Sequence, residues 1–268
     1  MLIHFHISCR RMLAALVILH GVLLSSSAPG QTNFFEQGIA AYKAGNFGEA
    51  AKQFEAETRR APSAESWSNL GNAEWQSQQH GPAVLAWERA LWINPFDKDA
   101  AAGLWFARQS SGLSAPPLRW WEAFSTCLPP NVWAGLAAAS FWAAVSAGVI
   151  FPVTVRWRRT AWSQSLAAFG LGIFLLALTG AYGVQTRARL AVVTAPAATM
   201  LQAPAAHAPV VSKLNAGEVA RTEFARGNYL YVRTGTGEAG WLERSQLHRI
   251  ASQEMNFLTT TINHSINP

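Results

Sequence analysis

Few residues of this 268-residue chain are charged, and cysteine is rare. Charged residues make up 13% of the chain, against about 25% in an average globular protein, whereas hydrophobic residues make up 50%. Of the two cysteines, Cys9 lies before the apolar stretch of the signal peptide that we assign below to residues 1–30. Cleavage of that peptide would leave only Cys127 in the mature chain. A single thiol can form neither an internal disulfide nor a cysteine zinc cluster.

The sequence also lacks the motifs of common catalytic and cofactor-binding sites. The seven histidines include no pair at metal-ligand spacing in the mature chain, and Gly235-Thr236-Gly237 lacks the strand–helix context of a phosphate loop. Cys127 is a weak candidate for a nucleophile because no histidine lies near it in the sequence. We therefore expect no catalytic residues, no metal ligands, no cofactor and no enzymatic activity.

The net charge of +6 is unevenly distributed. Residues 34–110 are mildly acidic, with seven Lys or Arg against nine Asp or Glu. Most of the surplus arginines flank apolar stretches, and they are Arg10, Arg11, Arg119, Arg156, Arg158, Arg159, Arg187 and Arg189. This distribution fits membrane topology better than nucleic-acid binding, which would concentrate positive charge on one soluble domain, so we expect no nucleic-acid partner.

The N-terminus has the layout of a secretory signal peptide. Two arginines precede the apolar stretch 12–24, and the small residues 25–30 follow it. We assign residues 1–30 to the signal, with cleavage after either Ala28 or Gly30. A buried helix of a soluble domain is the competing interpretation.

From residue 33 the sequence repeats with a period of 33. Gly38 recurs as Gly71 and Phe54 as Trp87, and Ala50 and Pro62 recur as Ala83 and Pro95. Each unit reads as two amphipathic helices, and the units cover about 34–62 and 67–95. A further helix over 97–109 would cap the second unit, so we expect a helical domain over 33–110.

These units resemble the tetratricopeptide repeat, a pair of helices that stacks into a solenoid. The second unit matches its pattern at Trp67, Leu70, Gly71, Ala83, Trp87, Ala90 and Pro95, whereas the first lacks the Leu before Gly38. Unrelated helical hairpins are the alternative. The resemblance implies a concave binding face lined by the first helices, here Phe35, Ile39, Tyr42, Ser68, Asn72 and Trp75. A plain packing role for Tyr42 and Trp75 is an equal alternative.

Two long apolar runs follow a Pro-rich linker over 111–130. Residues 131–155 and 161–186 contain no Asp, Glu, Lys or Arg, and each exceeds the ~20 residues needed to cross a bilayer. The basic turn Arg156–Arg159 lies between them, and Trp120, Trp121, Trp133, Trp157 and Trp162 stand near their ends as interface anchors. The sequence therefore predicts a two-helix transmembrane hairpin; a buried hairpin in a soluble core is the alternative.

The signal peptide and the hairpin together predict the localisation. Export would place the repeats outside the cytoplasm, and two crossings would return the chain to the same side. We expect a bacterial inner-membrane protein with both soluble domains in the periplasm.

After the second apolar run the periodicity changes to that of short strands. Strand-like segments at 189–193, 219–223, 229–233, 240–242 and 248–250 are separated by Gly-rich turns and by an Ala/Pro-rich insertion through Pro209. This order resembles the bacterial SH3 family and predicts an SH3-like barrel over 187–250, followed by a disordered tail over 251–268. Tyr229 departs from the Trp that many members of the family carry.

A shallow aromatic groove is the candidate binding site of the barrel. Tyr229 and Tyr231 alternate with Leu230 and Val232, so both tyrosines share one face of the strand. Trp241 is the third candidate, although a core position suits it better.

The whole order of segments is similar to the TPR–SH3 component of the Bacteroides-aerotolerance operons. The supporting residues are Asn94–Ala100, Pro130–Trp133 and Ala191–Pro196. The resemblance implies a non-enzymatic adaptor in a cell-envelope complex with von Willebrand A-domain membrane proteins as partners. The alternative function is binding or sensing of peptidoglycan through the SH3-like domain.

Overall fold

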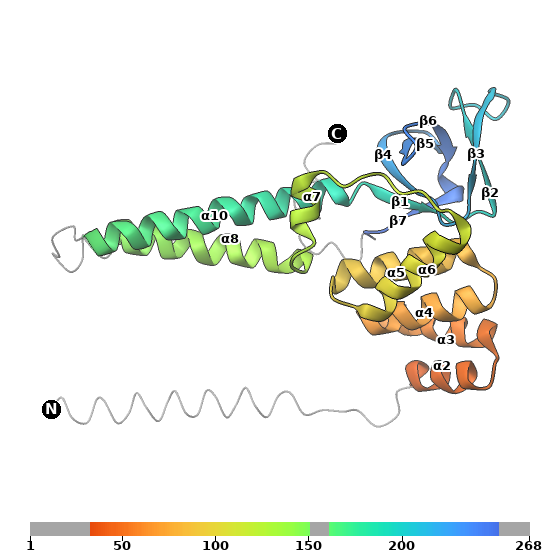
Figure 1. The fold of residues 1–268 in the computed structure, drawn as a ribbon, viewed down its shortest axis with the longest axis horizontal. Coiled ribbons are helices and arrows are strands. Elements are labelled where there is room, and N and C mark those ends of the chain that lie inside the picture. The colour runs from red at the N-terminus through yellow and green to blue at the C-terminus, as the bar shows by residue number, and fades with distance from the viewer. Residues whose placement is uncertain (1–32, 151–160, 252–268) are drawn as a thin grey trace. The chain divides into compact units, whose positions relative to one another are not determined.

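The protein is described by a computed structural model that covers residues 33–150 and 161–251. The chain divides into two compact units, residues 1–33 and residues 34–268, and the account below concerns the second. A helical region comes first, two long apolar helices follow, and a β domain ends the described part (Figure 1). The predicted signal peptide, the Arg156–Arg159 turn and nearly all of the predicted tail lie outside the described residues.

The helical region consists of five helices in antiparallel succession. They are α2 (Phe34–Lys43), α3 (Phe47–Arg60), α4 (Ala64–Gln76), α5 (His80–Ile93) and α6 (Lys98–Ser111). Polar side chains fix where two of them begin: Ser63 and Ser66 form a capping box at α4, and Asp97 accepts a hydrogen bond from the Ala100 N–H (2.9 Å) at α6. Helix α6 occupies the segment that the sequence predicts as a capping helix.

One contact between a glycine and an aromatic ring recurs along these helices. A Cβ atom on Gly38 would lie 2.7 Å from Phe54 Cε1, and a Cβ atom on Gly71 would lie 2.5 Å from Trp87 Cδ1. Gly103 of α6 receives the other side of the same Trp87 ring, with Cε2 at 2.5 Å from its Cβ position. The missing side chains therefore make room for the rings that fill the space between neighbouring helices, which accounts for the recurrence of Gly38 as Gly71 and of Phe54 as Trp87.

The two apolar runs form helices that pack against each other. A short helix, α7 (Trp120–Ser125), leads to α8 (Pro130–Val145), which continues as a π-helical turn over Ser146–Ile150, and α10 spans Ala161–Arg187. The segments Pro130–Ile150 and Trp162–Arg187 are long and apolar enough to cross a membrane, with mean hydropathies of 1.5 and 1.8. Small residues meet where the helices cross: a Cβ on Gly170 would lie 3.1 Å from Ala144 Cβ, and one on Gly148 would lie 3.2 Å from Ala167 Cβ.

The tryptophans near these helices divide into two groups. Trp120 and Trp162 are 69% and 84% exposed, as residues at a membrane interface would be. Trp133 is only 3% exposed, donates a hydrogen bond from Nε1 to the Ser125 carbonyl oxygen (3.1 Å), and covers Gly180. The prediction of an interface anchor at Trp133 is therefore replaced by a packing role between α7, α8 and α10.

The β domain is a seven-stranded antiparallel sheet in the order β3-β2-β6-β5-β4-β1-β7. Its strands are β1 (Leu190–Val193), β2 (Ala197–Leu201), β3 (Val210–Asn215), β4 (Val219–Arg226), β5 (Tyr229–Thr234), β6 (Ala239–Glu243) and β7 (Leu247–Arg249). The Ala/Pro-rich segment through Pro209 that we expected as an insertion instead contains β2 and the loop to β3, and β2 and β3 form a hairpin. Ala198 and Met200 alternate with more exposed residues along β2, and both are fully buried in the core of the sheet, which stabilises this alanine-rich strand.

Two cores stabilise this domain. One lies inside the sheet and includes Met200, Val232 and Leu242. The other joins the sheet to the helical region, because Val192, Val219 and Ile250 pack in one cluster with Val84, Trp87 and Leu104. Ala251, at the predicted start of the disordered tail, is 5% exposed and belongs to this second core. The sheet and the helices therefore share buried apolar surface.

Candidate binding surfaces

A groove runs across helices α2, α4 and α6 of the helical region. Its volume is about 450 Å³. Tyr42 comes from α2, Asn72, Trp75 and Gln76 come from α4, and Asp99, Ala102, Gly103 and Phe106 come from α6, with Trp87 beneath them. Because α2, α4 and α6 are alternate helices of the array, one continuous surface collects side chains from the first helices of two successive pairs and from α6.

The structure places the six predicted residues of this face in three environments. Tyr42, Asn72 and Trp75 line the groove. Phe35 and Ile39 instead pack against the core around Phe54, with the Phe35 and Phe54 ring centroids 5.9 Å apart. Ser68 is 4% exposed and its Oγ lies 3.5 Å from Asp97 Oδ1, so it joins α4 to the start of α6.

Asn72 is engaged within the protein. Its Oδ1 accepts a hydrogen bond from Trp87 Nε1 (3.1 Å), which satisfies the one polar atom of a ring that is 2% exposed. Trp75 is surrounded by other rings, with centroids at 4.3 Å from His80, 5.7 Å from Trp87 and 5.8 Å from Phe106. These contacts hold the aromatic floor of the groove in one arrangement.

A second candidate surface is an aromatic cluster on the sheet. Tyr231 stacks on Phe224 at 4.6 Å between centroids, and Trp241 meets both rings edge-on at 5.3 Å. Phe224 is 53% exposed, whereas Trp241 is 9% exposed and supports the cluster from below. Tyr229 lies at the start of β5, half-buried. The sequence prediction missed Phe224, because a bulge between Thr222 and Phe224 changes the register of β4 against β5.

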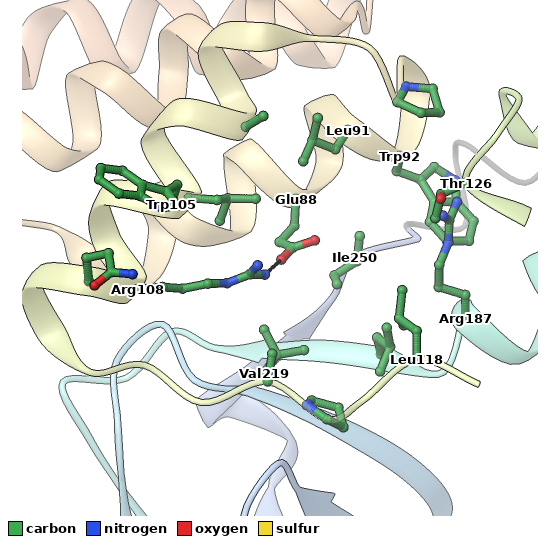
Figure 2. Close-up of a pocket in the computed structure, with 17 residues that line it drawn as sticks. Glu88, Leu91, Trp92, Trp105, Arg108, Leu118, Thr126, Arg187, Val219 and Ile250 are labelled. Atoms are coloured by element: carbon green, nitrogen blue, oxygen red, sulfur yellow. Dashed lines mark hydrogen bonds and ion pairs between the residues drawn. The ribbon is translucent and has the colours of Figure 1, made fainter. Parts of the chain in front are cut away.

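A cavity of about 560 Å³ lies where the helical region, the linker, the end of α10 and the sheet meet (Figure 2). Its ionisable lining residues are Glu88, Arg108 and Arg187. Glu88 accepts a hydrogen bond from Arg108 Nη2 (2.7 Å), while the Arg187 guanidinium lies over the Trp92 ring at 4.6 Å. Burial raises the pKa of Glu88 above its usual range, although both arginines act against that shift.

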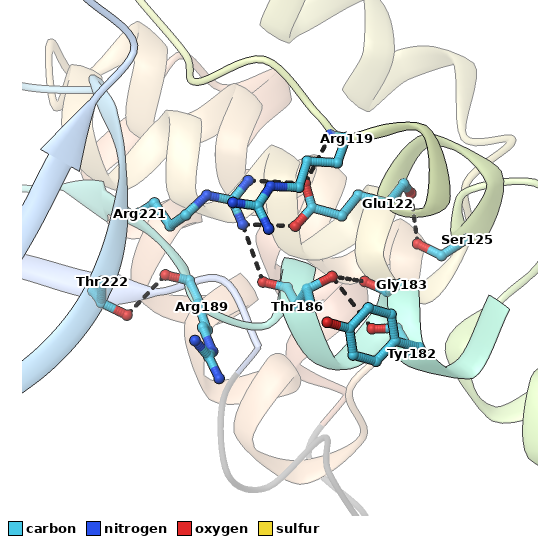
Figure 3. A network of polar contacts seen from close by, with 9 residues as sticks. All are labelled: Arg119, Glu122, Ser125, Tyr182, Gly183, Thr186, Arg189, Arg221 and Thr222. Atoms are coloured by element: carbon cyan, nitrogen blue, oxygen red, sulfur yellow. Dashed lines mark hydrogen bonds and ion pairs between the residues drawn. The ribbon is translucent and has the colours of Figure 1, made fainter. Parts of the chain in front are cut away.

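A polar network beside this cavity connects α7, α10 and β4 (Figure 3). Arg221 of β4 binds Glu122 of α7 with both nitrogens, Nη1 to Oε1 at 2.6 Å and Nη2 to Oε2 at 2.8 Å. The Arg119 backbone N–H donates to Glu122 Oε2 (2.9 Å), and Arg221 Nη1 also donates to the carbonyl oxygen of Thr186 in α10 (3.4 Å). The Glu122–Arg221 pair thus connects α7, which precedes the apolar helices, and the C-terminal end of α10 to strand β4.

Glu122 is fully buried, and its ionised form is stabilised there. Burial alone would raise its pKa, but the hydrogen bonds from Arg221 and from the Arg119 N–H, together with the Arg221 charge, hold the pKa below the usual range. No sequence motif indicates this pair, because its two residues are 99 positions apart.

The geometry of these surfaces suits binding. In the part of the chain that the structure describes, no group of three His, Cys, Asp or Glu side chains could hold a metal ion. Comparison of the chain with models of known protein families and with curated proteins gives no match. The case for function therefore rests on the surfaces themselves.

Proposed function

We propose that this chain is a membrane-anchored adaptor that holds a protein partner in the groove of its helical region. The observation that carries the proposal is the origin of the groove: its lining comes from α2, α4 and α6, the alternate helices of an array of paired helices. Such a surface is extended, partly aromatic and rigidly supported, which suits an extended or helical segment of another protein.

The recurring glycine–ring contact supports a tetratricopeptide-like array. Gly38, Gly71 and Gly103 occur at nearly equal intervals, and the Phe54 and Trp87 rings fill the spaces beside them. Under this proposal α6 is the first helix of a third unit, and its exposed Trp105 and Phe106 extend the apolar surface beyond the groove. The partners implied by the resemblance to the Bacteroides-aerotolerance proteins are von Willebrand A-domain membrane proteins.

A cross-linking experiment tests the adaptor proposal. A photoreactive amino acid at Gln76, an exposed residue of the groove, should cross-link an A-domain membrane protein in cells. The matched control is Lys52, which is exposed on α3 outside the groove lining. Equal cross-linking at the two positions, or products with lipid alone at Gln76, would count against the proposal.

The membrane anchor is supported by what α8 and α10 expose. Only 22% of the apolar window in each of the two segments is buried, and large side chains such as Trp142, Phe169 and Leu175 are 62%, 67% and 56% exposed. An apolar surface of this kind needs an apolar surrounding. We propose that both helices cross a bacterial inner membrane and that both soluble domains lie in the periplasm.

Cysteine labelling tests this topology. After Cys127→Ser, single cysteines are introduced at Gln76, Thr160 and His207. An impermeant thiol reagent should modify Gln76→Cys and His207→Cys in spheroplasts, and Thr160→Cys only after lysis. If Gln76→Cys and His207→Cys are labelled from opposite sides of the membrane, the hairpin does not cross twice.

The β domain supports a second candidate function, binding of cell-wall glycan. Its strand pairing, with β7-β1-β4-β5-β6 in succession and a 3-10 turn at Arg244–Gln246 before the last strand, suits an SH3-like barrel elaborated by the β2–β3 hairpin. The observation that favours wall binding is the partly exposed Phe224–Tyr231 stack, because aromatic faces present flat apolar surface to sugar rings.

Sedimentation with purified peptidoglycan tests this second function. The full chain is used, since Val192, Val219 and Ile250 are buried against the helical region and a β-domain fragment would expose them. Tyr231→Ala and Phe224→Ala should each release the protein from the wall material, whereas the exposed Val211→Ala on β3 should not. Sedimentation that is absent in the parent, or unchanged in both aromatic variants, would rule out this surface.

A further inference from the structure

Asp99 is the only charged side chain in the lining of the groove across α2, α4 and α6. It is exposed and lies in the first turn of α6, where Asp97 already caps the helix by accepting a hydrogen bond from the Ala100 N–H (2.9 Å). Among the residues that the structure describes, no lysine, arginine or histidine forms an ion pair with the Asp99 carboxylate. The groove therefore presents one negative charge, without an ion-pair partner, to its occupant.

Helix α6 separates this charge from an aromatic ring. Asp99, Ala102, Gly103 and Phe106 line the groove, and their spacing places them along one face of the helix. The rise from Asp99 to Phe106 along the helix axis is about 10 Å. Ala102 adds only a methyl group, and Gly103 adds no side chain, because the Trp87 ring occupies the space where its Cβ would stand (2.5 Å). No large side chain of α6 therefore lies between the carboxylate and the Phe106 ring.

An aromatic corner forms the other end of this path. The ring of Phe106 meets the ring of Trp75 from α4 at 79°, with centroids 5.8 Å apart, and Phe106 is 51% exposed. The Trp75 ring is held by further contacts with the rings of Trp87 and His80. Two rings at this angle offer the face of one and the edge of the other to an apolar side chain, which is removed from water there.

Asn72 supplies a polar group that suits a peptide backbone. Its Oδ1 accepts from Trp87 Nε1 (3.1 Å), so the group that it can offer to an occupant of the groove is the Nδ2 donor, which a peptide carbonyl oxygen can accept. An extended chain advances about 3.3 Å per residue, so about three residues cover the distance from Asp99 to Phe106. These dimensions suit an extended segment better than a single small cation.

We propose that the groove selects a basic segment of its partner. A lysine or arginine of that segment pairs with Asp99, and an apolar side chain about two to four positions away packs against Trp75 and Phe106. The inference rests on the proposed adaptor function and adds the chemistry of the partner. Charge complementarity carries it, because the one charged group of the lining is an acid, which attracts a cation and repels an acidic segment or a free carboxyl terminus.

Cross-linking in cells from Gln76, as described above, tests the inference in the full chain. Asp99→Lys should reduce the amount of captured protein about fivefold or more, because attraction of the basic residue becomes repulsion. Asp99→Glu keeps the charge and should capture as much as the parent. The matched control is Glu49→Lys, which makes the same change of charge at an exposed site on α3 outside the groove lining and should leave capture unchanged.

Selection of peptides on the parent protein is a measurement that needs no substitution. Displayed random peptides of about twelve residues are selected on the full chain in phosphatidylcholine nanodiscs, with empty nanodiscs for counter-selection. The enriched peptides should carry a lysine or arginine about two to four positions from an apolar residue. The tightest of them, measured by fluorescence anisotropy, should bind about threefold more weakly to Asp99→Asn, and it should also bind more weakly to Phe106→Ala.

Three results would overturn the inference. They are equal capture from Gln76 by the parent and by Asp99→Lys, enriched peptides that lack a basic residue, and binding of arginine amide as tight as that of the best peptide. The last result would identify a small cation as the ligand. The first two leave the adaptor function intact, whereas the absence of any protein captured from Gln76 in the parent would overturn that function itself.

Discussion

Two of the antiparallel helix pairs in this chain, α4–α5 and α8–α10, are packed in different ways. In the pair α4–α5 the largest side chain lies between the helices: Trp87 is 2% exposed and fills the space beside Gly71. In the pair α8–α10, Trp133 covers Gly180 near α7, but elsewhere small residues meet, with Ala144 against Gly170 and Ala167 against Gly148, and Phe169 is 67% exposed. Similar backbone arrangements thus bury a large ring at the centre of one pair and leave most large side chains of the other exposed.

The difference is what we expect if α8–α10 lies in a membrane, as proposed above, and α4–α5 lies in water. Burial of aromatic rings stabilises α4–α5 because water is the alternative environment of those rings. For α8–α10 the hydrophobic effect between the helices gains little if the surroundings are themselves apolar, and close contact of small residues then supplies the stabilisation. The two pairs should therefore respond differently to the same kinds of substitution.

The two pairs should differ most in how much stability they lose when one large side chain is removed from each. Trp87→Ala should lower the free energy of unfolding by about 3–5 kcal/mol, because it leaves a cavity between Gly71 and Gly103 and an unpaired Asn72. Leu175→Ala, 56% exposed on α10, should change it by less than about 0.5 kcal/mol. Urea unfolding of the full chain in micelles, followed by circular dichroism, measures both. Equal losses would mean that the two pairs do not differ as described.

A smaller effect is expected where the hairpin is joined to the sheet. Glu122→Gln should cost about 2–3 kcal/mol at pH 7, since it removes a buried charge that receives two hydrogen bonds from Arg221. The matched control is Glu223→Gln, which breaks an ion pair of partly exposed side chains with Arg233 (3.0 Å) and should cost less than about 1 kcal/mol.

The cost of Glu122→Gln should also depend on pH. The pKa of Glu122 is lower in the folded chain than its ordinary value of 4.5, so ionised Glu122 stabilises the folded state above that pH. This stabilisation is lost as the pH falls through the lower folded pKa. The difference in melting temperature between parent and variant should therefore be constant from pH 7 to about 5 and shrink on further acidification. A difference that grows at acidic pH would contradict the role assigned to the pair.

The smallest of these effects is expected inside the apolar hairpin. Gly170→Leu should separate α8 from α10 and cost about 1–2 kcal/mol, because a side chain there meets Ala144. Gly172→Leu is the matched control, since no atom lies within 4 Å of its Cβ position. Unfolding by titration with a denaturing detergent compares the two variants. A loss in Gly172→Leu as large as in Gly170→Leu would show that helix propensity, and not the contact, decides.

Local patterns in the sequence explain what could be predicted. The 33-residue period and the charge-free runs are local signals, and helices occupy both sets of segments. Strand β2 escaped prediction because it lies in an Ala- and Pro-rich segment that lacks the usual alternation of β-branched and polar residues. Trp133 was misplaced because sequence position near the end of an apolar run does not reveal whether a ring faces lipid or a neighbouring Gly180.

The sites depend on contacts that no local pattern records. The cavity combines Glu88, Arg187 and Ile250, which come from three distant parts of the chain. Tyr42, Asn72 and Trp75 could be placed on one face by the repeat period alone, whereas Ser68 shares that period and is buried by its approach to Asp97. The aromatic cluster needed the β4 bulge to bring Phe224 over Tyr231.

The short connection between α10 and β1 limits how far the β domain can reach. Only Ala188 and Arg189 separate Arg187 from Leu190, and a chain of that length spans at most about 11 Å. The hydrogen bond from Arg221 Nη1 to the Thr186 carbonyl oxygen further restrains the β domain near the end of α10. If α10 lies in a bilayer, this connection holds the β domain beside the lipid headgroups. A partner must then approach the membrane surface to bind the β domain.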